Sequence, residues 1–386
     1  MDILLITGDF YPITAGGAFE DTEVAKYANE QGHNVTVFTF KLDDSPRREL
    51  YQGIDVRRPI QPPFIQASIG SIRSNLGRLF ASFVLFLYVL KYSFSENSDV
   101  IYSTNHSVHW VSKVVGDFIN SPVVTIVSYT PSLDKSNKNI TNMSYLLEQL
   151  NFRFFMGKFI HCRTPQIRDD IKAIKSNTPV QVTHGIVNKE RVREAADSLP
   201  TEPGWEKTEF DINSQNHVLL FVGRLVPLKN PKIAIDVFSE LPDNFELIII
   251  GDGPEMYATK NYAKTIISKE KIHFAGEISH VETLQTMLLA DALVLTSTTE
   301  SYGAVVFEAL SCSSYVVAPR IGILPSLSDD IECLKLSPPK GMAKKIQDMN
   351  MSSSQRKVNS KLMEKYSIEN FADDVCTSFE KVVDNR

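Results

Sequence analysis

The chain has 386 residues, of which 43% are hydrophobic and 22% are charged, and its formal net charge at pH 7 is −6. This composition is that of an ordinary globular protein, and the negative charge argues against a general nucleic-acid binder. Because one hydrophobic core rarely organises more than about 250–300 residues, we expect two domains. The four cysteines show no Cys-x-x-Cys spacing, which argues against a zinc site or a disulfide framework and indicates reduced thiols.

The chain opens on an apolar run at residues 2–7 that we expect to be the first strand, without the basic start of an export signal. This start predicts a cytoplasmic protein. The loop that follows holds Gly16 and Gly17 and leads into a helical run at residues 20–30. Paired glycines there can bring backbone amides against a phosphate or a sugar, although a plain flexible loop would contain them too.

An uncharged, mostly apolar segment at residues 79–90 lies between Arg78 and Lys91. It is shorter than the roughly 20 residues that cross a membrane, so we expect that it does not span one. Its phenylalanines and leucines lie all round a helix, which predicts either a buried helix or a helix on a membrane surface. Arg73, Arg78 and Lys91 would suit the second alternative.

Short apolar runs alternate with segments of helical length along the whole chain. Most runs are continuously apolar, a pattern typical of parallel strands that helices cover on both faces. Strands separated by helices imply right-handed crossovers, so the predicted fold class is α/β, with two Rossmann-like, doubly wound domains that face each other across a cleft. The expected strands are residues 2–7, 34–40, 100–103, 123–127, 159–162, 180–183, 218–222, 246–250, 272–274, 292–296 and 315–318.

A polar stretch at residues 200–216, without any periodicity, separates the two sets of strands. We therefore place the first domain at residues 1–195 and the second at residues 196–365. The last segment, residues 366–386, holds an amphipathic pattern at 368–383. We expect a helix there that can cross back to the first domain.

Two cations follow the strand expected at residues 218–222. Gly223 ends that strand, and Arg224 and Lys229 stand five residues apart in the loop after it. The planar fork of arginine and the point charge of lysine together suit a diphosphate. Two ordinary surface cations would give the same pattern.

Gly251 and Gly253 form a tight turn directly after the strand expected at residues 246–250. The turn lacks the third glycine of a dinucleotide-binding fingerprint, so by itself it predicts no nucleotide.

Two glutamates, Glu300 and Glu308, follow the strand expected at residues 292–296 and stand at the start of a helix. Open α/β sheets bind ligands at the carboxyl ends of their strands. Carboxylates there can accept hydrogen bonds from the hydroxyls of a ribose or a sugar, and Gly303 allows a ligand to approach the backbone closely. The alternative is that both glutamates merely cap and solvate the helix.

Taken in this order, these elements resemble the family 4 retaining glycosyltransferases, also called group 1, which have the GT-B fold. The resemblance covers nearly the whole chain and is strongest between residues 218 and 322. The matching elements are Gly223-Arg224 with Lys229, the Gly-x-Gly-Pro turn at 251–254, the loop at 274–278, and the pair Glu300 and Glu308 with seven residues between them.

The resemblance implies a role for each matching residue. Arg224 and Lys229 would bind the diphosphate of a nucleotide-sugar donor and offset the charge that builds as it leaves. Glu308 would accept hydrogen bonds from the ribose, and Glu300 would contact the donor sugar as a catalytic residue. The other implied donor-binding residues are Gly16 and Gly17 in a closing loop, Gly251, Gly253, Gly276, Glu277 and Ile278 around the base and phosphates, and Tyr302 and Gly303 through their amides.

The resemblance also implies the reaction. The first domain would bind the acceptor, and the second would bind a UDP-sugar or GDP-sugar donor. A hexose would pass to a glycan or lipid-linked acceptor with retention, in a front-face transfer in which the leaving phosphate takes the acceptor proton. No cofactor is expected, and no metal, because Arg224 and Lys229 would supply the positive charge. A lipid-linked acceptor would suit a peripheral location on the inner face of a membrane.

One departure from the family pattern concerns a histidine. Many members carry one after the strand that matches residues 123–127, and here Ser128 follows. His106 and His109 are nearby candidates for the missing contact, and we expect His106 to be catalytic; a structural role is the alternative. Two other functions stay open: an epimerase or hydrolase on the same fold, and a sugar-nucleotide-binding subunit with weak activity. The combination of cations and glutamates favours transfer.

Overall fold

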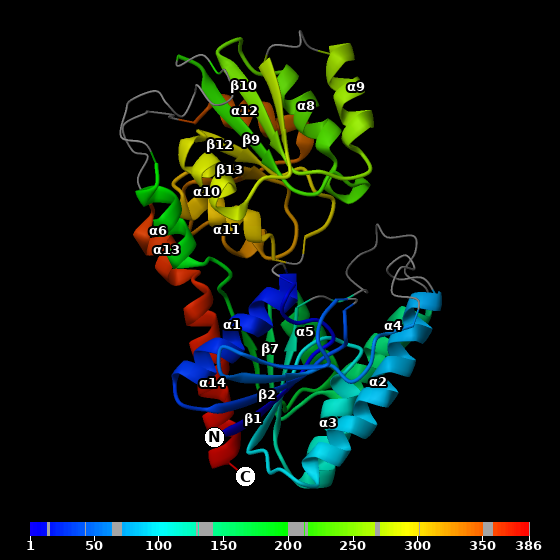
Figure 1. Ribbon diagram of the computed structural model, residues 1–386. Coiled ribbons are helices and arrows are strands. Elements are labelled where there is room, and N and C mark those ends of the chain that lie inside the picture. Colours follow the sequence, from blue (N-terminus) through cyan, green and yellow to red (C-terminus); the bar gives the residue numbers. More distant parts are fainter. Residues whose placement is uncertain are drawn as a thin grey trace. The chain divides into compact units, whose positions relative to one another are not determined.

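The computed structural model (Figure 1) describes residues 1–13, 16–42, 44–63, 72–128, 130, 142–199, 212, 215–266, 271–300, 302–349 and 358–385. The chain forms two compact units, one of Met1–Gly185 with Ile368–Arg386 and the other of Ile186–Ser367. The first limit therefore falls at residue 185 rather than at the predicted 195. The reason is that α6 (Lys189–Asp197) packs against α10 (His280–Leu289) in the second unit.

The described part of the first unit contains one sheet of eight strands, in the order β3-β4-β2-β1-β5-β6-β7-β8. The strands expected from the apolar runs are present, and all of them pair in parallel. The strands are β1 (Asp2–Ile6), β2 (Asn34–Phe38), β3 (Arg48–Tyr51), β4 (Ile54–Arg57), β5 (Val100–Ser103), β6 (Val123–Val127), β7 (Phe159–Cys162) and β8 (Val180–Val182).

Strands β3 and β4 were not predicted, and they pair antiparallel. Gln52 and Gly53 join them, both with positive φ, 49° and 86°. Two residues of positive φ make the turn that best matches the twist of a hairpin. Each strand has only four residues and alternates in burial, so neither shows the continuous apolar run that marks most of the others.

Helices cover both faces of this sheet, and β1 shows why. Its side chains alternate, so that Leu5 enters a core with α1 (Gly16–Glu30) and α14 (Ile368–Asp384), whereas Leu4 enters a core with α2 (Ile72–Ser93) and α3 (His109–Ile119). The remaining helices of the unit are α4 (Asn142–Leu150), the π-helix η2 (Asn151–Phe155) and α5 (Pro165–Ile174).

The C-terminal helix α14 lies where the amphipathic pattern predicted a helix, and it packs in the first unit. Figure 1 shows it, in red, alongside α1. Phe371, Val375 and Phe379 are buried in the shared core. The buried ring of His161 on β7 bonds the Ser378 hydroxyl at 2.9 Å, which ties the helix to the sheet.

Helix α2 is longer than the apolar segment that predicted it. Among the described residues it is the one helix that is long and apolar enough, by length and composition, to cross a membrane; 33% of its window Leu76–Ser93 is buried. Ala81, Leu85 and Val89 form its buried face. The side chain of Arg73 and most of the polar stretch 200–216 lie outside the described residues.

The second unit holds a fully parallel sheet of six strands within the described residues, in the order β11-β10-β9-β12-β13-β14. Only β14, three residues long, was not predicted. The strands are β9 (His217–Val222), β10 (Phe245–Ile250), β11 (Ile272–Gly276), β12 (Ala292–Val294), β13 (Tyr315–Ala318) and β14 (Leu334–Leu336). Helices besides α6 and α10 are α8 (Pro231–Ser239), α9 (Met256–Ile266), α11 (Ala304–Ser311), α12 (Pro339–Gln347), α13 (Ser360–Lys365), and the 3-10 turns η3 (Pro227–Lys229) and η5 (Leu324–Ser326). The four cysteines of the chain are free.

A buried carboxyl group lies at the carboxyl edge of the first sheet. Asp21 on α1 accepts hydrogen bonds from the hydroxyls of Thr7, which follows β1, at 2.7 Å and of Thr104, which follows β5, at 2.6 Å. Burial, together with the nearby charges of Glu20 and Asp9, raises the pKa of Asp21 to about 8, although the two hydroxyls lower it. Asp21 is therefore protonated in the native state at neutral pH.

We predict that Asp21 makes the protein less stable as the pH rises from about 4 to about 8. In this range the native state holds a proton that an unfolded aspartate, with a pKa near 3.9, has released. Asp21→Asn keeps an acceptor for both hydroxyls and removes the proton. Its melting temperature relative to the wild type should therefore rise between pH 5 and pH 8. The exposed Asp44→Asn is the control, and an Asp21→Asn difference that does not vary with pH would contradict the prediction.

Candidate active site

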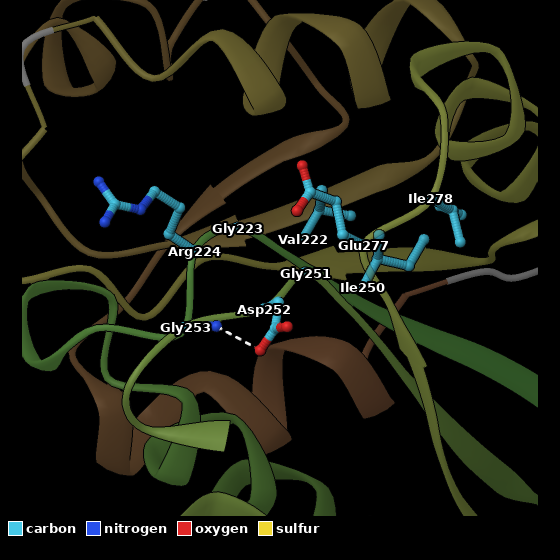
Figure 2. A pocket seen from close by; sticks show the side chains of 9 residues that line it. All are labelled: Val222, Gly223, Arg224, Ile250, Gly251, Asp252, Gly253, Glu277 and Ile278. Carbon is cyan, nitrogen blue, oxygen red and sulfur yellow. Dashed lines mark hydrogen bonds between the residues drawn. The ribbon is translucent and has the colours of Figure 1, made fainter. Parts of the chain in front are cut away.

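A pocket of about 570 Å³ opens where two neighbouring parallel strands of the second unit end. β9 and β10 pair along their whole length, so the loops after Val222 and Ile250 leave the sheet at the same edge. The pocket, drawn in Figure 2, is lined by Val222, Gly223, Arg224, Ile250, Gly251, Asp252, Gly253, Glu277 and Ile278. Five predicted donor-binding residues thus share one pocket: Arg224, Gly251, Gly253, Glu277 and Ile278.

The two glycines of the Gly-x-Gly-Pro turn let these loops pack backbone against backbone. A Cβ on Gly251, whose φ is +125°, would lie 2.1 Å from the carbonyl oxygen of Gly223. A Cβ on Gly253 would lie 2.5 Å from the carbonyl oxygen of Leu225. The Leu225 amide donates to the Asp252 carbonyl at 2.8 Å, which joins the loops. No other residue type fits at either glycine without moving one of the loops.

We predict that Gly251→Ala destabilises the second unit by about 1–3 kcal/mol, the usual cost of forcing a methyl group into a packed site. Gly276→Ala is the matched control. Its φ is also positive, +73°, but its Cβ would meet nothing within 4 Å. Urea unfolding should therefore show a larger loss for Gly251→Ala, and equal losses would mean that the clash with Gly223 is relieved without cost.

The side chains around the pocket differ in character. Val222, Ile250 and Ile278 give the pocket an apolar side. In Figure 2 the guanidinium of Arg224 points away from these side chains and lies at the opposite side of the pocket. Arg224 is exposed, and within the described residues its guanidinium has no hydrogen-bond or ion-pair partner. Asp252 instead accepts from the Gly253 amide at 2.6 Å, so its carboxylate turns toward its own loop.

Lys229 and Glu300 form an ion pair beside this edge of the sheet. The loop that carries Lys229 is tied to the loop after β12, because the Thr296 hydroxyl donates to the Lys229 carbonyl at 2.7 Å. The Thr298 amide donates to the Leu228 carbonyl at 2.9 Å. The Ser297 hydroxyl donates to the same Glu300 oxygen that Lys229 contacts, at 2.7 Å. The predicted cation and the predicted carboxylate therefore meet, although they are far apart in the sequence.

Glu308 lies on α11, and the residues before that helix set its position. Gly303 is the N-cap of α11, with φ 77° and ψ 58°, a conformation that favours glycine. The Tyr302 ring is buried and stacks on Phe307 at 4.5 Å, so only its backbone is left for a ligand. Glu308 Oε1 accepts a hydrogen bond from His280 Nε2 at 2.8 Å.

The remaining predicted residues belong to the first unit. Gly16 and Gly17 are exposed at the start of α1, and a Cβ on either would meet nothing within 4 Å. The His106 ring lies against the rings of His109, at 5.4 Å, and Phe152, at 6.1 Å. His109 is buried and bonds the Ser103 hydroxyl at 3.0 Å, and burial lowers its pKa well below the usual range. His109 is thus a neutral core residue, whereas His106 is partly exposed.

The comparison with known families decides the assignment. Residues 206–361 match the model of the family described as glycosyl transferases group 1. This segment, which makes up most of the second unit, is that of a group 1 glycosyltransferase.

One relative of this glycosyltransferase is the N-acetyl-alpha-D-glucosaminyl L-malate synthase of Bacillus anthracis, 20% identical over 82% of this chain and 79% of the relative. The solved sucrose-phosphate synthase of Thermosynechococcus elongatus superposes with a TM-score of 0.79 at 14% identity over 100% of both chains. Anabaena HepE, crystallised with UDP, gives a TM-score of 0.71 at 16% identity over 99% of this chain and 100% of HepE. The fold is the GT-B fold, with two Rossmann-like domains.

Several residues around the pocket of this glycosyltransferase were not predicted from the sequence. Val222 and Ile250 could have been found, because they end strands whose carboxyl ends hold the site. Nothing local in the sequence pointed to His280 or to its other partner, Arg191, because their contacts join segments far apart in the chain. Among the described residues, no group of three or more His, Cys, Asp or Glu side chains could hold a metal ion.

Proposed function

We propose that this glycosyltransferase is a family 4 enzyme that moves a hexose from a UDP- or GDP-sugar to a glycan or lipid-linked acceptor. In this proposal the anomeric configuration is retained, and neither a metal ion nor another cofactor takes part. The observation that carries it is the guanidinium of Arg224, free of partners in the described structure, on a pocket where β9 and β10 end. The UDP bound in the crystal of HepE, which shares the fold, supports a nucleotide donor.

Each feature of the site has a part in this proposal. The apolar side formed by Val222, Ile250 and Ile278 suits the flat face of a base, and Glu308 suits the ribose hydroxyls. Arg224 and Lys229 offset the negative charge on the diphosphate. When a diphosphate takes Lys229 from its ion pair, Glu300 is released to accept a hydrogen bond from the donor sugar. His106, Gly16 and Gly17 stay proposed contacts from the first unit.

In the proposed reaction the acceptor hydroxyl attacks the anomeric carbon on the face from which the diphosphate leaves. The new bond between the anomeric carbon and the acceptor oxygen forms while the bond to the phosphate oxygen breaks. The acceptor proton passes to that leaving phosphate oxygen. The protein supplies positive charge and position rather than a covalent nucleophile.

The proposal is tested by incubating the purified protein with UDP- and GDP-hexoses and a panel of glycan and lipid-linked acceptors, with and without EDTA. Proton NMR reads the configuration of the product. An α-glycoside from an α-linked donor, formed in EDTA as well, is the expected result. A β-glycoside would contradict retention, and loss of activity in EDTA would contradict metal independence. Free sugar alone would identify a hydrolase, an isomerised donor an epimerase, and binding without turnover a non-catalytic subunit.

The location is proposed from one surface of the first unit. The apolar face of α2, made of Leu76, Leu79, Phe80, Phe83, Leu87 and Tyr88, consists of side chains that are between 48% and 59% exposed. They recur every three or four residues, opposite the buried face. A contiguous exposed apolar patch is uncommon on a protein surface that meets only water. With Lys91 on the same helix, this face suits an anionic lipid surface, whereas Arg78 pairs with Asp9 at 3.8 Å. The proposal is a cytoplasmic protein bound peripherally to the inner face of a membrane.

Flotation with vesicles tests this location. The wild type should float with vesicles that contain anionic lipid, and the double variant Phe80→Ser/Phe83→Ser should float far less. Tyr257→Ser is the matched control, since Tyr257 is 79% exposed on α9 of the other unit. If the wild type stays unbound at low salt, or if the double variant floats as well as the control, the apolar face of α2 does not bind the membrane.

A further inference from the structure

Three side chains from three helices of the second unit form a row that ends at Glu308. Arg191 Nη1 on α6 lies 2.9 Å from His280 Nδ1, and His280 Nε2 at the start of α10 lies 2.8 Å from Glu308 Oε1 on α11. All three side chains are partly buried. The row therefore connects the carboxylate proposed to bind the ribose to a histidine and an arginine that stand in none of the family motifs found in the sequence.

The chemistry of the row fixes the direction of each hydrogen bond. A guanidinium can only donate, so Nδ1 of His280 must be the acceptor. The proton of the neutral ring then sits on Nε2, which donates to Glu308. One neutral tautomer satisfies both bonds. In this tautomer His280 donates to Oε1 of Glu308. Within the described residues Oε2 has no partner, so it can accept a hydrogen bond from a ligand hydroxyl.

His280 is also rigidly joined to the wall of the pocket. It follows Ile278, which lines the pocket, by two residues. Between them Ser279 caps α10: its hydroxyl accepts from the Glu282 amide at 3.2 Å, and its amide donates to the Glu282 carboxylate at 2.8 Å. This capping box limits the motion of the first turn of the helix. The loop at Ile278, which lines the pocket, thus also fixes the position of His280.

We propose that His280, oriented by Arg191, is a positioning residue that holds Glu308 ready to bind the ribose hydroxyls of the donor. This inference rests on the proposed function, which assigns the ribose to Glu308. A carboxylate already held by one oxygen loses less side-chain freedom when it binds. Removal of His280 should therefore weaken donor binding through the ribose, raise KM and leave kcat nearly unchanged.

The test compares each of UDP and GDP with its 2′,3′-dideoxy analogue by calorimetry. The wild type should bind one of the two ribonucleotides roughly tenfold or more tightly than its dideoxy form, the size expected for hydrogen bonds to a charged group. His280→Ala should lose most of this ratio, whereas His280→Gln, whose amide can still donate to Glu308, should keep a larger part of it. A change that is only structural would lower the melting temperature without changing the ratio.

The matched control is His273→Ala. His273 Nε2 bonds Glu246 at 2.7 Å in the same unit, so this variant breaks a similar pair that does not line the pocket. Its ratio of affinities, ribonucleotide over dideoxy analogue, should equal that of the wild type. If His280→Ala keeps the wild-type ratio, or if the wild type binds the nucleotide without preferring ribose, the positioning role is overturned. If the wild type binds neither nucleotide, the proposed function itself fails.

Discussion

Replacing Arg224 or Lys229 with alanine is expected to lower kcat/KM for sugar transfer by about 10²–10³-fold, the usual effect of removing one group that stabilises charge in a transition state. The leaving diphosphate gains negative charge as its bond to the sugar breaks. Arg224 is a free cation on the pocket within the described structure. Lys229 is held nearby by Glu300. Because both would act on the same charge, the two losses should not simply add in the double variant.

The matched control for these cations is Lys232→Ala. Lys232 lies on α8, just after the loop that carries Lys229, and pairs with Glu255 at 3.3 Å. If the loss of activity came only from removing one positive charge, Lys232→Ala would lose activity too. If it came from losing a direct contact with the diphosphate, Lys232→Ala would keep its activity. Steady-state kinetics with the donor varied should show wild-type behaviour for Lys232→Ala. Full activity in both Arg224→Ala and Lys229→Ala would remove the basis for a metal-independent transfer.

Arg163→Ala is expected to lower the free energy of unfolding by about 3–5 kcal/mol, the usual cost of breaking a buried ion pair from one side. Arg163 follows β7 and contacts Glu20 of α1 at 3.0 Å, with both side chains buried. Its guanidinium also donates to the carbonyls of Thr183 at 3.0 Å and Gly185 at 2.8 Å, and lies 4.5 Å from the centre of the Phe371 ring. Burial raises the pKa of Glu20, and the charge of Arg163 counteracts this rise. Without Arg163 the buried carboxylate would have no compensating charge.

Two further variants separate the charge from the packing. Arg163→Ala/Glu20→Gln removes the uncompensated carboxylate, so its thermal unfolding should recover part of the loss. Arg168→Ala breaks a pair with Asp169 whose side chains are 40% and 62% exposed, and it should cost little. If Arg163→Ala unfolds at the same temperature as Arg168→Ala, the buried network does not hold the first unit together.

The sequence predicted most of the sheet framework because parallel strands covered on both faces are apolar along their whole length. Val123–Val127 and Phe245–Ile250 are buried throughout; the first was expected with these bounds and the second as residues 246–250. The hairpin of β3 and β4 was missed because its short strands alternate, and β14 was missed because three residues carry no pattern. The first limit between the units was placed late, because the packing of α6 on α10 has no local signal.

The site was predictable where residues follow strands directly, as at Arg224 and Gly251. It was not predictable where tertiary contacts decide. In the sequence Asp21 has the pattern of an ordinary polar residue on a surface helix. In the structure it is buried between two threonines that follow separate strands. The contact between His280 and Glu308 joins two helices, and only the folded chain brings them together.

Nucleotide-sugar binding by this protein is tested by a thermal-shift screen of the purified protein against UDP, GDP, ADP and their common sugars, with and without EDTA. A ligand that binds only the native state raises the melting temperature by mass action. We predict a clear rise with one nucleoside diphosphate, kept in EDTA and lost in Arg224→Ala. No rise with any of the nucleotides would contradict this prediction.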